Sequence, residues 1–196
     1  MGESRCVDHN ARMPHLRPGL PLAIALAFAG LPGLAAAADA PGTDLAAEHA
    51  LSAAGMAGAQ IAARASKNIK PAALQCLLAL PPDAFVPMFR EQLSLALTPD
   101  ELAATEAVYG GPLRDKILRY GVAMVYRSRG LEPPGGDVVF TPAESVVMDR
   151  FAMTSAADKL YRQDALSQPA LAKIREKYTL PLFKACRDKG EASAAP

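Results

Sequence analysis

Apolar residues recur along this chain at the three- and four-residue spacing of helices, and the alternating pattern of strands is nearly absent. The clearest apolar stripe falls between residues 83 and 96 and comprises Phe85, Met88, Phe89, Leu93 and Ala96. A second stripe, near the end of the chain, comprises Leu171, Ile174, Tyr178, Leu182 and Cys186. The pattern predicts an all-α fold, a compact bundle of about five to seven helices.

Prolines and glycines indicate where these helices begin and end. We expect helices over residues 44–67, 71–80, 83–96 and 112–129, two more that begin at 99 and 142, and a last one from 167. Asp83 is the expected cap of the third helix, and Pro181 is expected to kink or break the last one. The one long loop covers residues 131–140, and its Pro-Pro-Gly-Gly centre is typical of turns.

Two of the helix starts share one capping motif. Thr98-Pro99-Asp100-Glu101 places a threonine at the N-cap, a proline at the first helical position and a glutamate that can reach back to the cap. Thr141-Pro142-Ala143-Glu144 repeats this motif 43 residues later. We therefore predict a capping box between Thr98 and Glu101 and a second one between Thr141 and Glu144.

The match between the two segments continues without a gap. Val108 corresponds to Phe151, and Asp115-Lys116-Ile117 corresponds to Asp158-Lys159-Leu160. A degenerate helix-corner-helix repeat is one interpretation of this match. Chance is the alternative, because capping boxes are common in helical proteins.

The first segment also contains a recognisable order of residues, which is Glu101-Leu102, Val108-Tyr109, Gly111-Pro112 and Lys116. This order resembles a family of exported bacterial helical domains of unknown function, with a signature of the type Glu-Leu...Phe-Tyr-x-Ser-Pro-x-Gly-x-Lys. Arg114 stands where the family has its glycine, and the second segment keeps Phe151 and Lys159 but lacks the proline. The resemblance implies an exported helical domain and no established activity. The motif residues suit a helix corner, in which the aromatic residue anchors the end of one helix and the next helix packs back.

The first 38 residues have the order of a secretory signal peptide. Charge-free and largely apolar residues run from Leu20 to Leu34, and Ala36-Ala37-Ala38 meets the small-x-small rule for cleavage. Cleavage after Ala40 and an uncleaved membrane anchor are the alternatives. The residues before Met13 include acids that do not suit a signal peptide, so Met13 is a candidate for the true start. We predict a signal peptide over residues 1–38 and a single helical domain over residues 39–196.

Removal of this leader leaves a formally neutral chain. The whole sequence has 21 lysines and arginines and 20 aspartates and glutamates, and the leader holds three of the former and two of the latter, which leaves 18 of each. A neutral domain lacks the basic surface that binds nucleic acid or an anionic membrane. We therefore expect no nucleic-acid partner, and no membrane span in the mature chain.

Cys76 and Cys186 are the two cysteines that follow the leader. An even count in an oxidising compartment favours one disulfide, and two buried free thiols are the alternative. The bond would close a loop of about 110 residues, which the chain-entropy model values at about 4–5 kcal/mol.

No motif for catalysis or for ligand binding stands out. His49 is the only histidine after the leader, and a zinc site needs several ligands, so we expect neither metal nor cofactor. Glu106 and Asp149 occupy the same position in the two repeat segments and are the candidates for a pair of hydrolytic carboxylates. Solvated surface charge is the alternative for both, so the sequence predicts no catalytic residue.

These observations favour a periplasmic or secreted protein that is not an enzyme and that acts through contacts with another envelope protein. An immunity-type inhibitor is one specific version, with the loop around residues 132–137 as the contacting wedge. A cell-envelope hydrolase and a carrier of a small apolar ligand are the alternatives.

The first prediction concerns export and oxidation. Expression of the full chain in a bacterial host should give a periplasmic species that begins at Asp39 and is two hydrogens lighter than its reduced form. Intact-mass measurement with and without reductant checks both features. A cell-associated species that keeps the leader would contradict cleavage, and an unchanged mass on reduction would contradict the disulfide.

Overall fold

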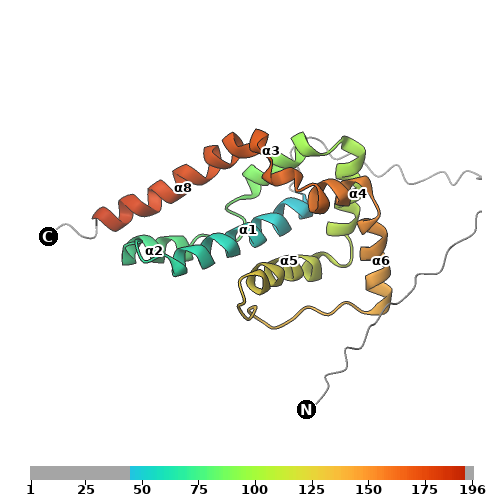
Figure 1. Cartoon of the computed structure of the whole chain (residues 1–196), viewed down its shortest axis with the longest axis horizontal. Coiled ribbons are helices and arrows are strands. Elements are labelled where there is room, and N and C mark those ends of the chain that lie inside the picture. The colour runs from blue at the N-terminus through green and yellow to red at the C-terminus, as the bar shows by residue number, and fades with distance from the viewer. Residues whose placement is uncertain (1–44, 193–196) are drawn as a thin grey trace, which may run out of the picture. The chain divides into compact units, whose positions relative to one another are not determined.

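The computed structural model describes residues 45–192, and one alanine-rich helix, α1 (Ala46–Ala65), is central to them (Figure 1). Four other helices pack directly on it, and they are α2 (Pro71–Leu78), α3 (Val86–Ala96), α4 (Pro99–Tyr109) and α5 (Arg114–Ser128). Alanine is the best helix former, and its short side chain lets neighbouring helices approach closely. A side chain at Gly55 would crowd the ring of Phe89, so this glycine allows α3 to pack on α1.

The chain then continues through α6 (Pro142–Ala152), a single turn α7 (Ser155–Ala157) and a π-helical turn (Asp158–Arg162). Two 3-10 turns (Ala165–Ser167 and Pro169–Leu171) lead into the long helix α8 (Ala172–Ala192). The described residues contain eight α-helices and no strand, so the all-α prediction is confirmed. The helix count is slightly above the expected range, because the second repeat segment breaks at Thr154 and forms the extra turn α7.

Two groups of buried apolar residues lie against different parts of α1. The first joins the start of α1 to the repeat segments, and its larger members are Leu93, Leu97, Tyr109, Ile117, Phe151 and Leu160. The ring of Phe151 packs edge-to-face on Tyr109 at 6.0 Å and on Tyr161 at 6.4 Å between centroids. The second group joins the middle of α1 to α3 and α8, and it comprises Met56, Phe85, Met88, Leu171 and Ile174.

The predicted cap at Asp83 is wrong, and of the two outcomes expected at Pro181, a kink or a break, the break does not occur. Asp83 does not cap α3, which begins at Val86 after a turn in which the Val86 N–H donates to the Asp83 carbonyl at 2.9 Å. Pro87 accounts for this start, because proline lacks an N–H and fits the first helical turn. Pro181 does not break α8, which continues to Ala192. Tyr178 and Leu182, on either side of this proline, both pack on the second apolar group.

Helix α8 returns to two helices that lie early in the described residues, α2 and α3, and packs on both. At its N-terminal half, Glu91 of α3 accepts hydrogen bonds from Lys177 Nζ at 2.7 Å and from the Tyr178 hydroxyl at 2.8 Å. At its C-terminal half, Cys186 is bonded to Cys76 of α2, with 5.3 Å between the Cα atoms. The predicted disulfide is therefore present, and it fastens this return.

The long loop between α5 and α6 is held by an ion pair. The guanidinium of Arg127 donates to both carboxylate oxygens of Asp137 at 2.7 Å. Gly135 and Gly136 both have positive φ angles, as the predicted Pro-Pro-Gly-Gly turn requires. The loop is thereby tied to the end of α5.

The predicted signal peptide, residues 1–38, lies outside the described residues. Within residues 45–192, no helix combines the length and the apolar character that crossing a membrane requires.

The second prediction concerns the disulfide. Replacement of both Cys76 and Cys186 by serine should lower the free energy of unfolding by about 4 kcal/mol, because the bond closes a loop of about 110 residues. Urea unfolding followed by circular dichroism measures this loss, and the reduced wild-type protein should match the variant. A loss below about 1 kcal/mol would show that packing alone holds α8 in place.

Candidate functional site

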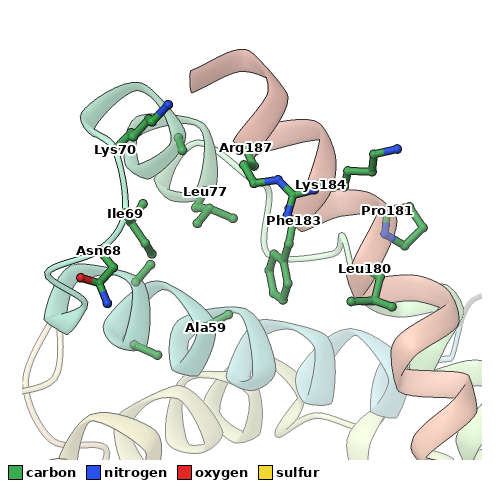
Figure 2. A pocket seen from close by; sticks show the side chains of 13 residues that line it. Ala59, Asn68, Ile69, Lys70, Leu77, Leu180, Pro181, Phe183, Lys184 and Arg187 are labelled. Carbon is green, nitrogen blue, oxygen red and sulfur yellow. The ribbon is translucent and has the colours of Figure 1, made fainter. Parts of the chain in front are cut away.

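A groove opens between the C-terminal half of α1, the short helix α2 and the C-terminal half of α8 (Figure 2). Its volume is about 1200 Å³. The residues that line it include Ala59, Ala62 and Ala63 from α1, Leu77 from α2, and Leu180 and Phe183 from α8. Two stretches that are distant in the sequence, residues 59–77 and residues 180–187, therefore form one surface.

The groove stays open because the side chains on its α1 side are alanines, which are too short to fill the space below α2 and α8. Figure 2 shows Leu77 and the ring of Phe183 pointing into this space. Leu180 is 60% exposed and Phe183 is 37% exposed. Large apolar side chains are thus left in contact with water where the helices do not meet.

Two interactions hold α2 as a wall of the groove. Gln60 of α1 donates its Nε2 group toward the carbonyls of Leu78 at 3.3 Å and Leu80 at 3.4 Å, where α2 ends. The Cys76–Cys186 bond joins α2 to α8 on the other side. A helix of eight residues has little stability of its own, so these links determine where α2 lies.

The rim of the groove is basic. Lys70 lies at the start of α2, and Lys184 and Arg187 lie on α8 across the groove. Lys70 and Lys184 make no ion pair with any described carboxylate, and the Nε atom of Arg187 lies 3.9 Å from the adjacent Asp188. In Figure 2 the ammonium ends of Lys70 and Lys184 point away from the apolar interior of the groove. The site therefore combines an apolar interior with cations at its edge.

The two predicted capping boxes are formed at the opposite end of the view in Figure 1, at the starts of α4 and α6. The carboxylate of Glu101 accepts from the Thr98 N–H at 2.8 Å, and that of Glu144 accepts from the Thr141 N–H at 2.7 Å. These residues stabilise helix starts and do not line the groove.

Each capping glutamate is also paired with a lysine of the other repeat segment. Lys159 Nζ donates to Glu101 Oε2 at 2.6 Å, and Lys116 Nζ donates to Glu144 Oε2 at 2.5 Å. The glutamates are 43 residues apart, and so are the lysines. The lysine of each repeat segment thus bonds to the capping glutamate of the other segment. This reciprocal pairing supports the interpretation of a degenerate repeat over chance.

These ion pairs change the acidity of both glutamates. The hydrogen bond from Lys159, together with that from the Thr98 N–H, holds the pKa of Glu101 at about 2. Lys116 and the Thr141 N–H have the same effect on Glu144, whose pKa is also about 2. Both carboxylates therefore stay ionised in the folded protein well below the pH at which they are protonated in an unfolded chain.

Glu106, one of the two candidate hydrolytic carboxylates, caps α1 instead. Its oxygens accept from the N–H groups of Ala46 at 3.0 Å and Ala47 at 3.3 Å. It lies close to Glu48, which is 2% exposed and is paired with Arg90 at 3.0 Å. Burial raises the pKa of Glu48, and the charge of Glu106 adds to this effect. Both carboxylates bind donors of the fold, and neither lines the groove.

The structure does not combine the other candidate residues into a reactive site. Asp149, the second candidate carboxylate, is exposed on α6, whereas Glu106 faces the start of α1. His49 lies partly buried within α1. Among residues 45–192 there is no group of three or more histidine, cysteine, aspartate and glutamate side chains suited to a metal ion.

Sequence reasoning found the disulfide beside the groove but missed the groove itself. One signal was present, because residues 49–82 contain Arg64, Lys67 and Lys70 but no aspartate or glutamate before Asp83. The net charge of the whole chain hides this separation of charge, because acidic residues elsewhere in the chain offset these cations.

The third prediction concerns acid stability. The folded pKa of Glu101 and Glu144 is below the ordinary 4.5, so their contribution is complete above pH 4.5 and is lost as the pH falls toward 2. The double substitution Glu101→Gln/Glu144→Gln should reduce proton uptake on unfolding in this range by up to two protons. The slope of the unfolding free energy against pH, measured between pH 2 and pH 6, gives this proton uptake.

Glu132→Gln/Glu176→Gln is the matched control, because both of these glutamates are exposed and neither makes an ion pair among the described residues. The control should keep the wild-type slope. An equal slope in both double variants would show that the capping pairs do not govern acid stability.

No protein-family model, no curated protein and no solved structure matches this chain. The resemblance noted from the order of residues Glu101 to Lys116 therefore stays a prediction.

Proposed function

We propose that this chain is an exported, non-enzymatic protein that binds a helix of another envelope protein in the groove between α1, α2 and α8. The observation that carries the proposal is the open apolar groove of about 1200 Å³. The Cys76–Cys186 bond supports an oxidising compartment, since disulfides persist there.

The apolar lining supports a role in binding. Folded proteins rarely leave large contiguous apolar surfaces in water, and such surfaces mark interaction sites when they occur. Leu180 and Phe183 are exposed within the groove although the same helix buries Ile174 elsewhere. The links through Gln60 and the disulfide fix the positions of the walls before any partner binds, which reduces the entropic cost of association.

The dimensions and the lining favour a helix as the occupant. The volume is above the range of about 300–1,000 Å³ that is usual for small-molecule pockets. An amphipathic helix places apolar residues at i, i+3, i+4 and i+7, which is the common way of filling a groove of this kind. Ala59, Ala62 and Ala63 allow its backbone to approach α1 closely.

The other functions are less well supported by the geometry. A hydrolase that uses Glu106 and Asp149 would need both carboxylates free and facing one substrate, but Glu106 binds two N–H groups of α1. A carrier of a small apolar ligand would use the same groove, and the peptide titration below distinguishes it from a protein that binds a helix. An immunity-type inhibitor is a narrower form of the proposal, in which the bound helix belongs to an enzyme.

The fourth prediction tests the groove with a synthetic amphipathic peptide of about 18 residues that carries a leucine stripe. The oxidised protein should bind the labelled peptide with micromolar affinity in a fluorescence anisotropy titration, as is usual for a short helix in a preformed groove. A peptide of the same composition in scrambled order, without the stripe, should bind at least about tenfold more weakly.

Leu180→Glu should weaken binding by at least about tenfold, because it places a charge in the apolar interior. Leu95→Glu is the matched control, since Leu95 is 65% exposed and lies outside the groove, and it should bind like the wild type. Equal weakening by both substitutions, or equal binding of the striped and scrambled peptides, would contradict the proposal.

A further inference from the structure

We infer that the helix bound in this groove is acidic, with carboxylates on both sides of its apolar stripe. The inference rests on the proposed function above and adds the chemistry of the partner. It follows from the positions of the cations around the groove.

Cations lie on two opposite walls. Lys70 is at the start of α2, and Lys184 and Arg187 are one turn apart on α8. Lys70 and Lys184 have no carboxylate partner among the described residues. Unpaired cations beside an apolar surface attract a ligand with complementary charge and repel a basic one.

The charge around the groove extends beyond its rim. Residues 49–82, which form most of α1 and all of α2, contain Arg64, Lys67 and Lys70 and no acid. Arg64 and Lys67 are exposed at the end of α1 from which the connection to α2 begins. Because the chain without its predicted leader is formally neutral, the positive charge at this end is balanced by negative charge on other parts of the surface. Such a field speeds the encounter with an acidic partner.

The direction of the side chains determines where the carboxylates of the partner must lie. Leu77 and Phe183 point into the groove, whereas the ammonium ends of Lys70 and Lys184 point away from it (Figure 2). An apolar stripe therefore fits between the walls, and acidic residues beside that stripe reach the lysines at the rim. A single lipid headgroup would reach the cations of one wall, so cations on both walls favour a helix with acids on both flanks.

The experiment uses three synthetic peptides that share one leucine stripe and differ only in the residues flanking it, which are glutamate, glutamine or lysine. At about 0.05 M salt, the glutamate peptide should bind the oxidised protein about tenfold more tightly than the glutamine peptide, and the lysine peptide should bind most weakly. The difference should shrink at about 0.5 M salt, because exposed charges are then screened.

Charge reversal provides the decisive variant. Lys70→Glu/Lys184→Glu should reverse the order, so that the lysine peptide binds more tightly than the glutamate peptide. The matched control is Arg119→Glu/Lys173→Glu, which makes the same change of net charge at exposed positions outside the groove and should keep the wild-type order.

The outcomes separate this inference from the proposed function. Equal affinity for the glutamate and glutamine peptides would overturn the inference and leave the groove as a helix site. The same order in both double variants would show that net charge alone, and not the rim, selects the peptide, and would also overturn it. Binding of anionic phosphatidylglycerol vesicles but of none of the peptides would overturn both, because the occupant would then be a lipid.

Discussion

The bond between Cys76 and Cys186 is the interaction on which the groove depends. Helix α2 has only eight residues, and an isolated helix of that length is not stable in water. The bond fixes the C-terminal end of α2 to the C-terminal half of α8, while Gln60 of α1 donates to the Leu78 carbonyl at the same end of α2. Helices α2 and α8 also pack on each other, and the ring of Phe183 packs edge-to-face on Phe85 with 6.4 Å between the centroids. The covalent link therefore fixes two walls of the groove relative to each other.

The alanine surface of α1 has opposite effects at its two ends. Near its start, larger residues such as Leu93, Ile117 and Phe151 reach Ala46, Ala47 and Ala50 and form a closed core. That core is strengthened by the capping pairs of Glu101 with Lys159 and Glu144 with Lys116, which tie the two repeat segments to each other. Near the end of α1, Ala59, Ala62 and Ala63 line the groove, and their short side chains leave the space beside α2 and α8 unfilled. The closed core and the open groove therefore lie at different ends of one helix.

Sequence reasoning succeeded where the determinants are local and failed where they are distant. The capping boxes at Thr98 and Thr141 depend on residues three positions apart, so the sequence predicts them directly. The disulfide followed from the even cysteine count and the expected compartment. By contrast, Glu106 reaches Ala46 across 60 residues, and no pattern near either residue indicates that contact. Pro181 was expected to interrupt α8, but tertiary packing on both sides overrides that local preference. The groove arises only when residues 180–187 of α8 are packed beside residues 59–77.

The central claim is that the groove, and no other surface, receives an acidic helix. The most direct test is a two-dimensional NMR titration of the oxidised protein, labelled with nitrogen-15, with the glutamate-flanked peptide. The account predicts that the largest shifts fall on the end of α1, on α2 around Leu77 and on residues 180–187 of α8. Shifts confined to α5 and the loop at residues 131–141, with the groove unchanged, would contradict it.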